Sequence, residues 1–318
     1  DGTVGGVDAD ASGRVELTSG VNGGERYQVV RGIRAGAHMI ASKPIQAHMI
    51  TGDIQSHWES RWFTLYPRER WANEYYNPVS QTLASAPVWV FLYNRSASTL
   101  PITYQTTSGF GNTNVPANGV GTVVMPSGSG ARFFTSNGVP FTAVVAVDVD
   151  AAADDSDTYD WGCTLIPAAA LSPALLTGYG AGSSDGTGNG SPVWAMAVSN
   201  ATLYMDRDGN PATGLFTNAA GIRYDVATNV VAFQSVRFYD TSGDNSQTGM
   251  RVFTTNGVKI AGAWGEDPSV AAIGNPFLDA GTTIQPVPAG SASKSAAVTN
   301  DLNLDGTVDP GDQILYTL

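Results

Sequence analysis

One stretch of sequence occurs twice in this chain and limits what the chain can fold into. Residues 131–148 carry Asn137-Gly138 between two runs of apolar and β-branched residues, and residues 250–267 repeat the pattern without a gap around Asn256-Gly257. Asn-Gly is the favoured pair for a two-residue turn between antiparallel strands, because both turn positions adopt positive φ. Each copy is therefore predicted to be a β-hairpin whose second strand ends at an aspartate.

A third and weaker copy precedes these two. Its turn is expected at Lys43-Pro44, its second strand follows the turn, and Asp53 closes it. A Thr-x-x-Pro sequence ends all three copies, at residues 64–67, 164–167 and 283–286. Short strands separated by Gly, Asn, Asp and Ser clusters are typical of all-β proteins. The sequence thus predicts an all-β fold of tandem β-sandwich or jelly-roll-like lobes, built from repeated hairpin units.

The spacing of the repeats suggests how the chain divides. A Pro-Val-Trp motif also recurs, at residues 87–89 and 192–194, and a period of about 100 residues is too long for a solenoid repeat. Only residues 167–176, rich in Ala and Leu, are expected to form a helix longer than one turn. We expect four segments: a first β unit at 1–80, a second at 81–180, a third at 181–290, and a linker, calcium loop and C-terminal strand at 291–318.

Composition excludes several kinds of partner. The chain has 16 Lys and Arg against 28 Asp and Glu, which gives a net charge of -12. Without a basic cluster, a nucleic acid is not an expected partner. No apolar run is long enough to span a bilayer, so no membrane insertion is expected. The acidic balance favours an extracellular or cell-surface location. The single cysteine, Cys163, is expected to be a small buried residue of the core.

The most specific local signal lies near the C-terminus. Residues 301–312 place oxygen donors where a twelve-residue loop binds calcium, with Gly306 at the sharp turn. The predicted calcium ligands are Asp301, Asn303, Asp305, Thr307, Asp309 and Asp312. The last ligand is Asp rather than Glu, as in dockerin-type loops. The loop and the strand-like residues 314–318 also resemble the start of β-sandwich repeats in bacterial surface proteins.

Two other acidic segments could bind a cation. One loop carries a possible second set of metal ligands at Asp148, Asp150, Asp154, Asp155 and Asp157. These carboxylates would repel one another unless they are solvated or bound to a hard cation, and both interpretations stay open. The Asp-Arg-Asp-Gly-Asn turn at 206–210 resembles the start of a calcium loop, but it lacks an acid at the twelfth position.

A family resemblance is carried by four motifs upstream. They are Ser42-Lys-Pro-Ile-Gln46, Thr51-Gly-Asp53, Thr64-Leu-Tyr-Pro67 and Trp71-Ala-Asn-Glu-Tyr-Tyr-Asn-Pro-Val79. Together they resemble the domain first named from IgGFc-binding protein, clearly over residues 40–79 and more weakly to about residue 290. The resemblance implies a β-rich module of secreted and surface proteins of bacteria. It implies neither catalytic residues nor antibody binding, and Ala72 stands where the family usually has Gly.

The aromatic residues of this region offer an alternative function. Exposed Trp and Tyr faces stack on sugar rings, and the possible glycan-binding residues are Trp58, Trp62, Trp71, Tyr75 and Tyr76. The competing interpretation is a buried aromatic seam between lobes. No catalytic residue is predicted, because the usual nucleophile, metalloprotease and nucleotide motifs do not occur. Glu59, Glu69 and Glu74 could pair as glycosidase acids, but nothing distinguishes them from salt-bridge partners.

The sequence as a whole favours a structural role outside the cell. The leading hypothesis is a calcium-stabilised protein of a bacterial surface or matrix that associates with copies of itself into a fibre or layer. The expected mode is strand addition at the ends of the chain, since an unpaired strand can extend a sheet edge of a neighbour. The alternative is that both ends pack on their own chain. A glycan-binding adhesin is the second hypothesis and a polysaccharide-active enzyme the third.

Overall fold

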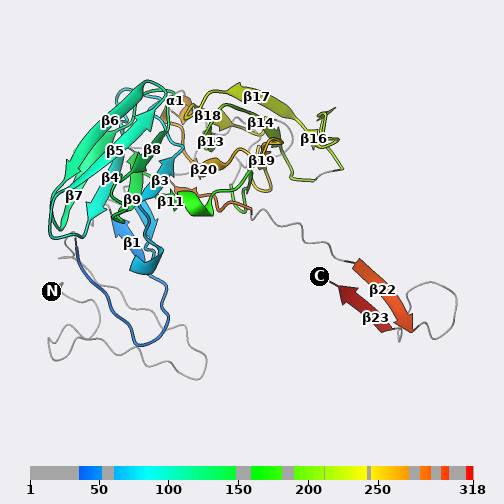
Figure 1. Ribbon diagram of the computed structural model, residues 1–318. Coiled ribbons are helices and arrows are strands. Elements are labelled where there is room, and N and C mark those ends of the chain that lie inside the picture. Colours follow the sequence, from blue (N-terminus) through cyan, green and yellow to red (C-terminus); the bar gives the residue numbers. More distant parts are fainter. Residues whose placement is uncertain are drawn as a thin grey trace.

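The structure is a computed structural model, and it is almost entirely antiparallel β-sheet (Figure 1). It describes residues 36–51, 61–147, 159–180, 190–210, 212–241, 245–271 and 280–287, and the backbone of 295–300 and 313–317. The predicted all-β, sandwich-like fold class is confirmed. Within these residues the helical parts are the 3-10 turns η1 (Arg68–Arg70) and η2 (Ala168–Ala170) and the single-turn helix α1 (Pro268–Ala271). No described helix is long and apolar enough to cross a bilayer.

Nine strands form what we call the first sandwich. They are β3 (Glu74–Asn77), β4 (Val88–Asn94), β5 (Leu100–Thr106), β6 (Gly109–Val115), β7 (Gly119–Val124), β8 (Ala131–Phe134), β9 (Thr142–Val147), β10 (Gly162–Thr164) and β11 (Ile166–Pro167). One sheet has the order β10-β9-β4-β7 and the other β11-β3-β8-β5-β6. Alternate residues of β4 are buried, which places Val88, Val90 and Leu92 in the core between the sheets.

Eight strands form the second sandwich. They are β12 (Ala174–Leu176), β13 (Val193–Ala197), β14 (Ala201–Asp206), β17 (Val226–Val230), β18 (Ser235–Phe238), β19 (Arg251–Phe253), β20 (Ile260–Gly265) and β21 (Gly281–Thr283). Their orders, β12-β19-β14-β17 and β21-β20-β13-β18, match β3-β8-β5-β6 and β10-β9-β4-β7 strand for strand. The second sandwich therefore repeats the topology of the first.

The Asn-Gly turns occupy the same place in both sandwiches, but they are not hairpin turns. β8 and β9 belong to different sheets, and so do β19 and β20. The hairpin prediction is wrong on this point, because each turn is a corner that carries the chain from one sheet to the other. Locally the two corners agree: Gly138 and Gly257 have φ of 73° and 75°. In each, the Asn side-chain oxygen accepts the N–H two residues on, at 3.2 Å and 3.3 Å.

Backbone hydrogen bonds explain why the strands beside these corners do not pair. In the first sandwich the N–H groups of Thr135 and Phe141, on either side of the turn, donate to the carbonyls of Asn73 and Ala72, both at 2.9 Å. In the second, Thr254 and Ile260 donate at 2.9 Å to the equivalent pair, residues 173 and 172. The segment that leads into each sandwich thus lies between the two strands of the corner. Its carbonyl groups accept the backbone hydrogen bonds that would join the two strands in a hairpin.

A two-stranded ribbon precedes the sandwiches. We call it the N-terminal ribbon; it consists of β1 (His48–Thr51) and β2 (Arg61–Thr64), paired antiparallel. The pairs β9–β10 and β20–β21 have the same arrangement, and both β2 and β10 lead into a proline and a 3-10 turn. The ribbon is therefore the counterpart of one sheet edge of a sandwich. Asp53, the expected closing acid, lies outside the described residues.

Two further strand pairs complete the description. β15 (Phe216–Thr217) and β16 (Arg223–Tyr224) pair within the excursion between β14 and β17. β22 (Ser295–Asn300) pairs antiparallel with β23 (Gln313–Thr317), so part of the expected linker is a strand. Residues 167–176 contain η2 and β12 rather than the expected helix, because Pro173 cannot donate a helical hydrogen bond. The boundaries expected at residues 80, 180 and 290 stay predictions.

Candidate functional site: the junctions between units

Several predicted site residues cannot be placed. All six predicted ligands of the C-terminal calcium loop, Asp301 to Asp312, lie outside the described residues, as do the acidic loop from Asp148 to Asp157 and Trp58. Among the residues that are described, no group of three or more His, Cys, Asp or Glu could hold a metal ion. Both predicted calcium sites therefore stay predictions.

The expected aromatic platform is divided between core and surface. Tyr75 is 2% exposed, accepts the Ala72 N–H and donates to the Phe141 carbonyl, both at 2.9 Å. Burial raises its pKa to about 12. Tyr76 is also buried, so neither ring offers a face to a sugar, and the expectation for these two residues is wrong. Trp71 is half-buried with its indole N–H on the Tyr66 carbonyl at 3.2 Å, whereas Trp62 is 57% exposed.

The glutamates considered as acids have structural surroundings. Glu74 accepts two hydrogen bonds from Arg132, at 2.9 Å and 3.0 Å, and one from the Tyr76 hydroxyl at 2.7 Å. Burial alone would raise the pKa of Glu74, but the bonds from Arg132 and Tyr76 and the Arg132 charge outweigh it and lower the pKa. Glu69 is exposed in η1, and Glu59 lies outside the described residues.

Contacts between successive units form the most organised polar feature. The Arg61 side chain of the ribbon donates to the Val147 carbonyl of the first sandwich at 3.1 Å. Trp161 of the first sandwich donates to the Glu266 carbonyl of the second at 2.9 Å. Arg61 is the first residue of β2, and Trp161 directly precedes β10. The acceptors are equivalent too, since Val147 is the last residue of β9 and Glu266 directly follows β20. The same link thus occurs twice.

A threonine ladder runs through the same two junctions. The Thr164 hydroxyl donates to the Thr64 carbonyl at 2.7 Å, and the Thr283 hydroxyl donates to the Thr164 carbonyl. These are the threonines that open the three Thr-x-x-Pro sequences. The repeated motif found in the sequence is therefore a repeated contact, with each unit bonded through its threonine to the unit before it.

An aromatic ring covers a glycine at each junction. A Cβ on Gly162 would lie 2.8 Å from the Phe63 ring of the ribbon. A Cβ on Gly281, at the equivalent position, would overlap the Trp161 ring of the first sandwich. Only glycine lets the rings pack this closely on the strand behind them. Trp62 is the residue of the ribbon that aligns with Gly162 and Gly281, and it is exposed. Among the described residues, each covering ring therefore comes from the earlier unit and each covered glycine from the later one.

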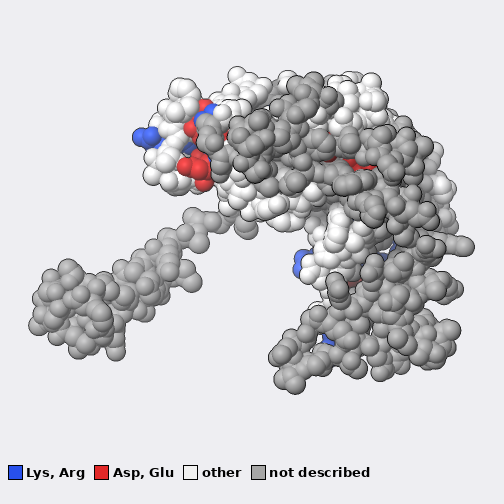
Figure 2. Space-filling model, turned by 180° about the vertical axis from the view of Figure 1, so that it is seen from behind, with Lys and Arg blue, Asp and Glu red and all other residues white. Residues whose placement is uncertain are grey.

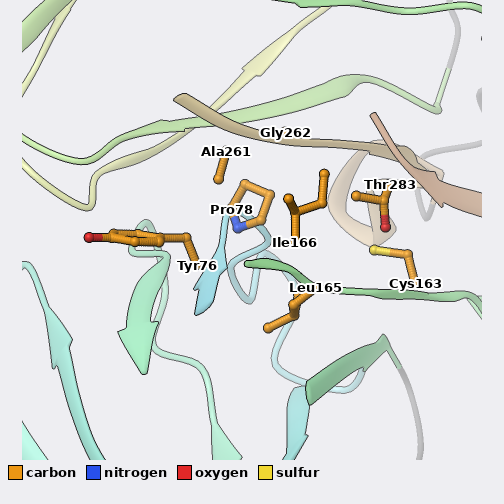
Figure 3. A pocket seen from close by; sticks show the side chains of 8 residues that line it. All are labelled: Tyr76, Pro78, Cys163, Leu165, Ile166, Ala261, Gly262 and Thr283. Carbon is orange, nitrogen blue, oxygen red and sulfur yellow. The ribbon is translucent and has the colours of Figure 1, made fainter. Parts of the chain in front are cut away.

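The second junction is also filled by apolar side chains. Trp161 and Trp194 pack with ring centroids 6.5 Å apart, and Trp194 belongs to the core of the first sandwich although its strand is in the second. Eight residues from both sandwiches enclose a cavity of about 10 Å³, room for no more than one water (Figure 3). Burial raises the pKa of Cys163, one of these eight, to about 12, so the thiol is an inert core group as expected.

One open groove is large enough for a small ligand. It has a volume of about 450 Å³ and is lined by Val226, Thr228, Ser235, Val236, Arg237, Phe238, Tyr239, Ser269 and Val270. Its charged group, Arg237, is engaged by Asp267, which also accepts the Tyr239 hydroxyl at 2.7 Å. The groove therefore presents a closed polar network rather than free groups that converge on a ligand.

Comparison of the chain with protein-family models, curated proteins and solved structures finds no match. Function is therefore inferred from the chain's own residues.

Proposed function

We propose that the chain is a structural module of an extracellular bacterial surface or matrix. The observation that carries this proposal is the junction that repeats between the ribbon and the first sandwich and again between the two sandwiches. An interface that joins unlike faces can be used many times along one assembly, because each added unit presents the same face for the next. Rigid arrays of sandwiches joined in this way suit load-bearing or spacing roles.

Two features of the sequence support the extracellular setting. The resemblance of residues 40–79 to the domain named from IgGFc-binding protein suggests membership of a class found in secreted and surface proteins. The loop at 301–312 suggests stabilisation by calcium, which would bind only where its concentration matches the affinity of the loop. Calcium removal is expected to lower the melting temperature, and Asp305→Ala should have the same effect.

We further propose that the chain associates with copies of itself through the ribbon and the C-terminal strand. Ile50 and Trp62 face each other across β1 and β2 and are 50% and 57% exposed. In the described residues β1 pairs with β2 alone, which leaves one sheet edge of the ribbon open to another strand. β23 is paired with β22 on one side, so its second edge is the candidate donor.

Sedimentation velocity at rising protein concentration tests this association. The full chain should form species larger than a monomer, and removal of residues 313–318 or the change Trp62→Ser should reduce them. Phe110→Ser is the matched control, because Phe110 is an aromatic residue that is 68% exposed on β6 of the first sandwich. A full chain that stays monomeric, or polymers unchanged by both alterations, would rule the association out.

Exposure of Trp62 also supports a second candidate, a glycan-binding adhesin. Stacking on one Trp face contributes modestly to sugar binding. Polysaccharide pull-down with the full chain and with Trp62→Ala separates the candidates. The adhesin requires polysaccharide binding that the substitution weakens, while the structural module requires no such binding.

A further inference from the structure

A buried aspartate lies beside the carboxylate of Asp208 at the end of β14. Asp206 is fully buried, and neither of its carboxylate oxygens has a hydrogen-bond partner among the described residues. Arg251 is its direct neighbour on β19, but the guanidinium group stacks over the Phe253 ring at 4.4 Å and forms no ion pair with Asp206 in the described structure. A buried carboxylate in this state is costly unless another charge compensates it.

Two neighbouring carboxylates disfavour the ionised form of Asp206 further. Burial, the adjoining carboxylate of Asp208 and the charge of Asp225 together raise the pKa of Asp206 to about 6. Figure 2 shows acidic and basic side chains gathered at this end of the molecule, the end that carries β16 in Figure 1.

Hydrogen bonds to two other aspartates order the excursion that follows Asp206. Asp208 accepts the Asn210 N–H at 2.9 Å and the Thr213 hydroxyl at 2.8 Å. Asp225 accepts the N–H groups of Arg207 and Leu215, at 2.9 Å and 3.1 Å, and so ties the two ends of the excursion together. Asp225 thus accepts a backbone N–H on each carboxylate oxygen, whereas neither oxygen of Asp206 accepts a hydrogen bond from a basic side chain in the described structure.

We propose that Asp206 and Asp208 bind a calcium ion at the start of the excursion between β14 and β17. The possible metal ligands here are all oxygen atoms, which suits a hard cation. Calcium tolerates the flexible geometry of an irregular loop, whereas magnesium requires a nearly ideal octahedron. The carbonyl groups of the loop and water molecules supply the other ligands. Bound calcium neutralises the buried carboxylate and fixes the excursion on the sandwich. This site lies away from the ribbon, so its failure would leave the proposed self-association untouched.

The test uses the full chain with the C-terminal loop silenced by Asp305→Asn and Asp312→Asn. Calorimetric titration with calcium should then show that adding Asp206→Asn removes one site from this background. Glu69→Gln is the control, since it removes one exposed acid from η1 and should leave the number of sites unchanged. A background chain that binds no calcium, or equal numbers of sites with and without Asp206→Asn, would overturn the proposal.

Melting temperatures give a second readout that does not depend on counting sites. In EDTA, the Asp206→Asn variant should melt no lower than the background chain. The substitution removes an uncompensated buried charge, and the Asn side chain has nearly the same shape as Asp. In about 1 mM calcium the background chain should gain about 5 °C more than the variant. If Asp206 merely shares a proton with Asp208, the two chains will differ in melting temperature by the same amount in EDTA and in calcium. That result would exclude the calcium site.

Discussion

The two sandwiches have the same strand order and the same corners, yet they differ in one connection. In the first, β5 and β6 are joined by the two residues between Thr106 and Gly109. In the second, the corresponding strands β14 and β17 are separated by the excursion at 207–225, which contains β15 and β16. Both versions leave the sheet order intact, so this edge of a sandwich tolerates insertion, as exposed strand connections generally do.

The two sandwiches also differ in the residue near the end of the strand that precedes this connection. Gln105 pairs with Arg132 in the first sandwich, and Asp206 pairs with Arg251 at the equivalent place in the second. Gln105 is half-buried, whereas Asp206 is fully buried beneath its excursion. The corners and junctions are therefore common to both sandwiches. The excursion with its buried aspartate occurs in the second sandwich and not in the first. Four predictions test this view.

The largest effect is expected at the junction between the sandwiches. Trp161→Ala should reduce the free energy of unfolding by about 4 kcal/mol, since it empties a fully buried site and removes the bond to Glu266. Trp62→Ala, at an exposed ring of the ribbon, is the control and should change it little. Guanidinium denaturation measures both. Similar losses for the two tryptophans would show that the junction is not a stabilising interface.

A smaller effect is expected where the ring covers glycine. Gly281→Ala should cost about 2 kcal/mol, because the added methyl group overlaps the Trp161 ring and forces the strand away. The matched change is Gly178→Ala, since no atom lies within 4 Å of a Cβ there. Thermal unfolding of both variants provides the comparison, and an unchanged melting temperature for Gly281→Ala would contradict the packing described.

The hydrogen bond from Tyr239 to Asp267 predicts a pH-dependent effect on stability. Burial favours a raised pKa for Asp267, but bonds from neighbouring side chains, including Tyr239 and Ser269, and the Arg237 charge lower it below its usual 3.8. A lowered folded-state pKa contributes stability above the ordinary value and loses it as pH falls through the folded-state value. Tyr239→Phe should therefore cost about 1.5 kcal/mol at pH 7 and progressively less in acid.

Denaturation curves at several pH values measure this dependence. Tyr179→Phe is the control because Tyr179 is 61% exposed, and it should show little cost at any pH. A cost of Tyr239→Phe that is constant down to strong acid would mean that the hydroxyl does not stabilise the ionised carboxylate.

The smallest effect tests whether the two corners are equivalent. Gly138→Ala and Gly257→Ala should each cost about 1 kcal/mol, because an alanine at φ near 75° is strained in the same way at both sites. Unfolding free energies that differ by much more than the measurement error would show that the repeated sequence does not make a repeated structure.

The repetition of the fold could be predicted from the sequence, but the path of the chain at each repeat could not. Asn-Gly pairs at 137–138 and 256–257 specify a tight turn with positive φ, and both turns have that local geometry. Whether the flanking strands pair depends on which groups take their backbone hydrogen bonds. Here Ala72 and Asn73 take them in the first sandwich, and no local pattern reveals a partner so far away in the sequence.

The sites were predictable to a lesser degree. The turn at 206–210 resembles the start of a calcium loop in sequence, but the burial of Asp206, on which the proposed site depends, follows from the packing of β14. Aromatic content at 71–76 could not separate the core ring of Tyr75 from the half-buried ring of Trp71, since burial is set by strand register. The Thr-x-x-Pro repeats were found in the sequence, whereas their contact with one another exists only in the assembled fold.

A diffraction structure of the full chain tests the repeated junction most directly. We expect the Thr283 hydroxyl to donate to the Thr164 carbonyl and the Thr164 hydroxyl to donate to the Thr64 carbonyl. We also expect β9 and β10 to contact the ribbon as β20 and β21 contact the first sandwich. A structure in which either threonine bond is missing, or in which the two junctions cannot be superposed, would contradict it.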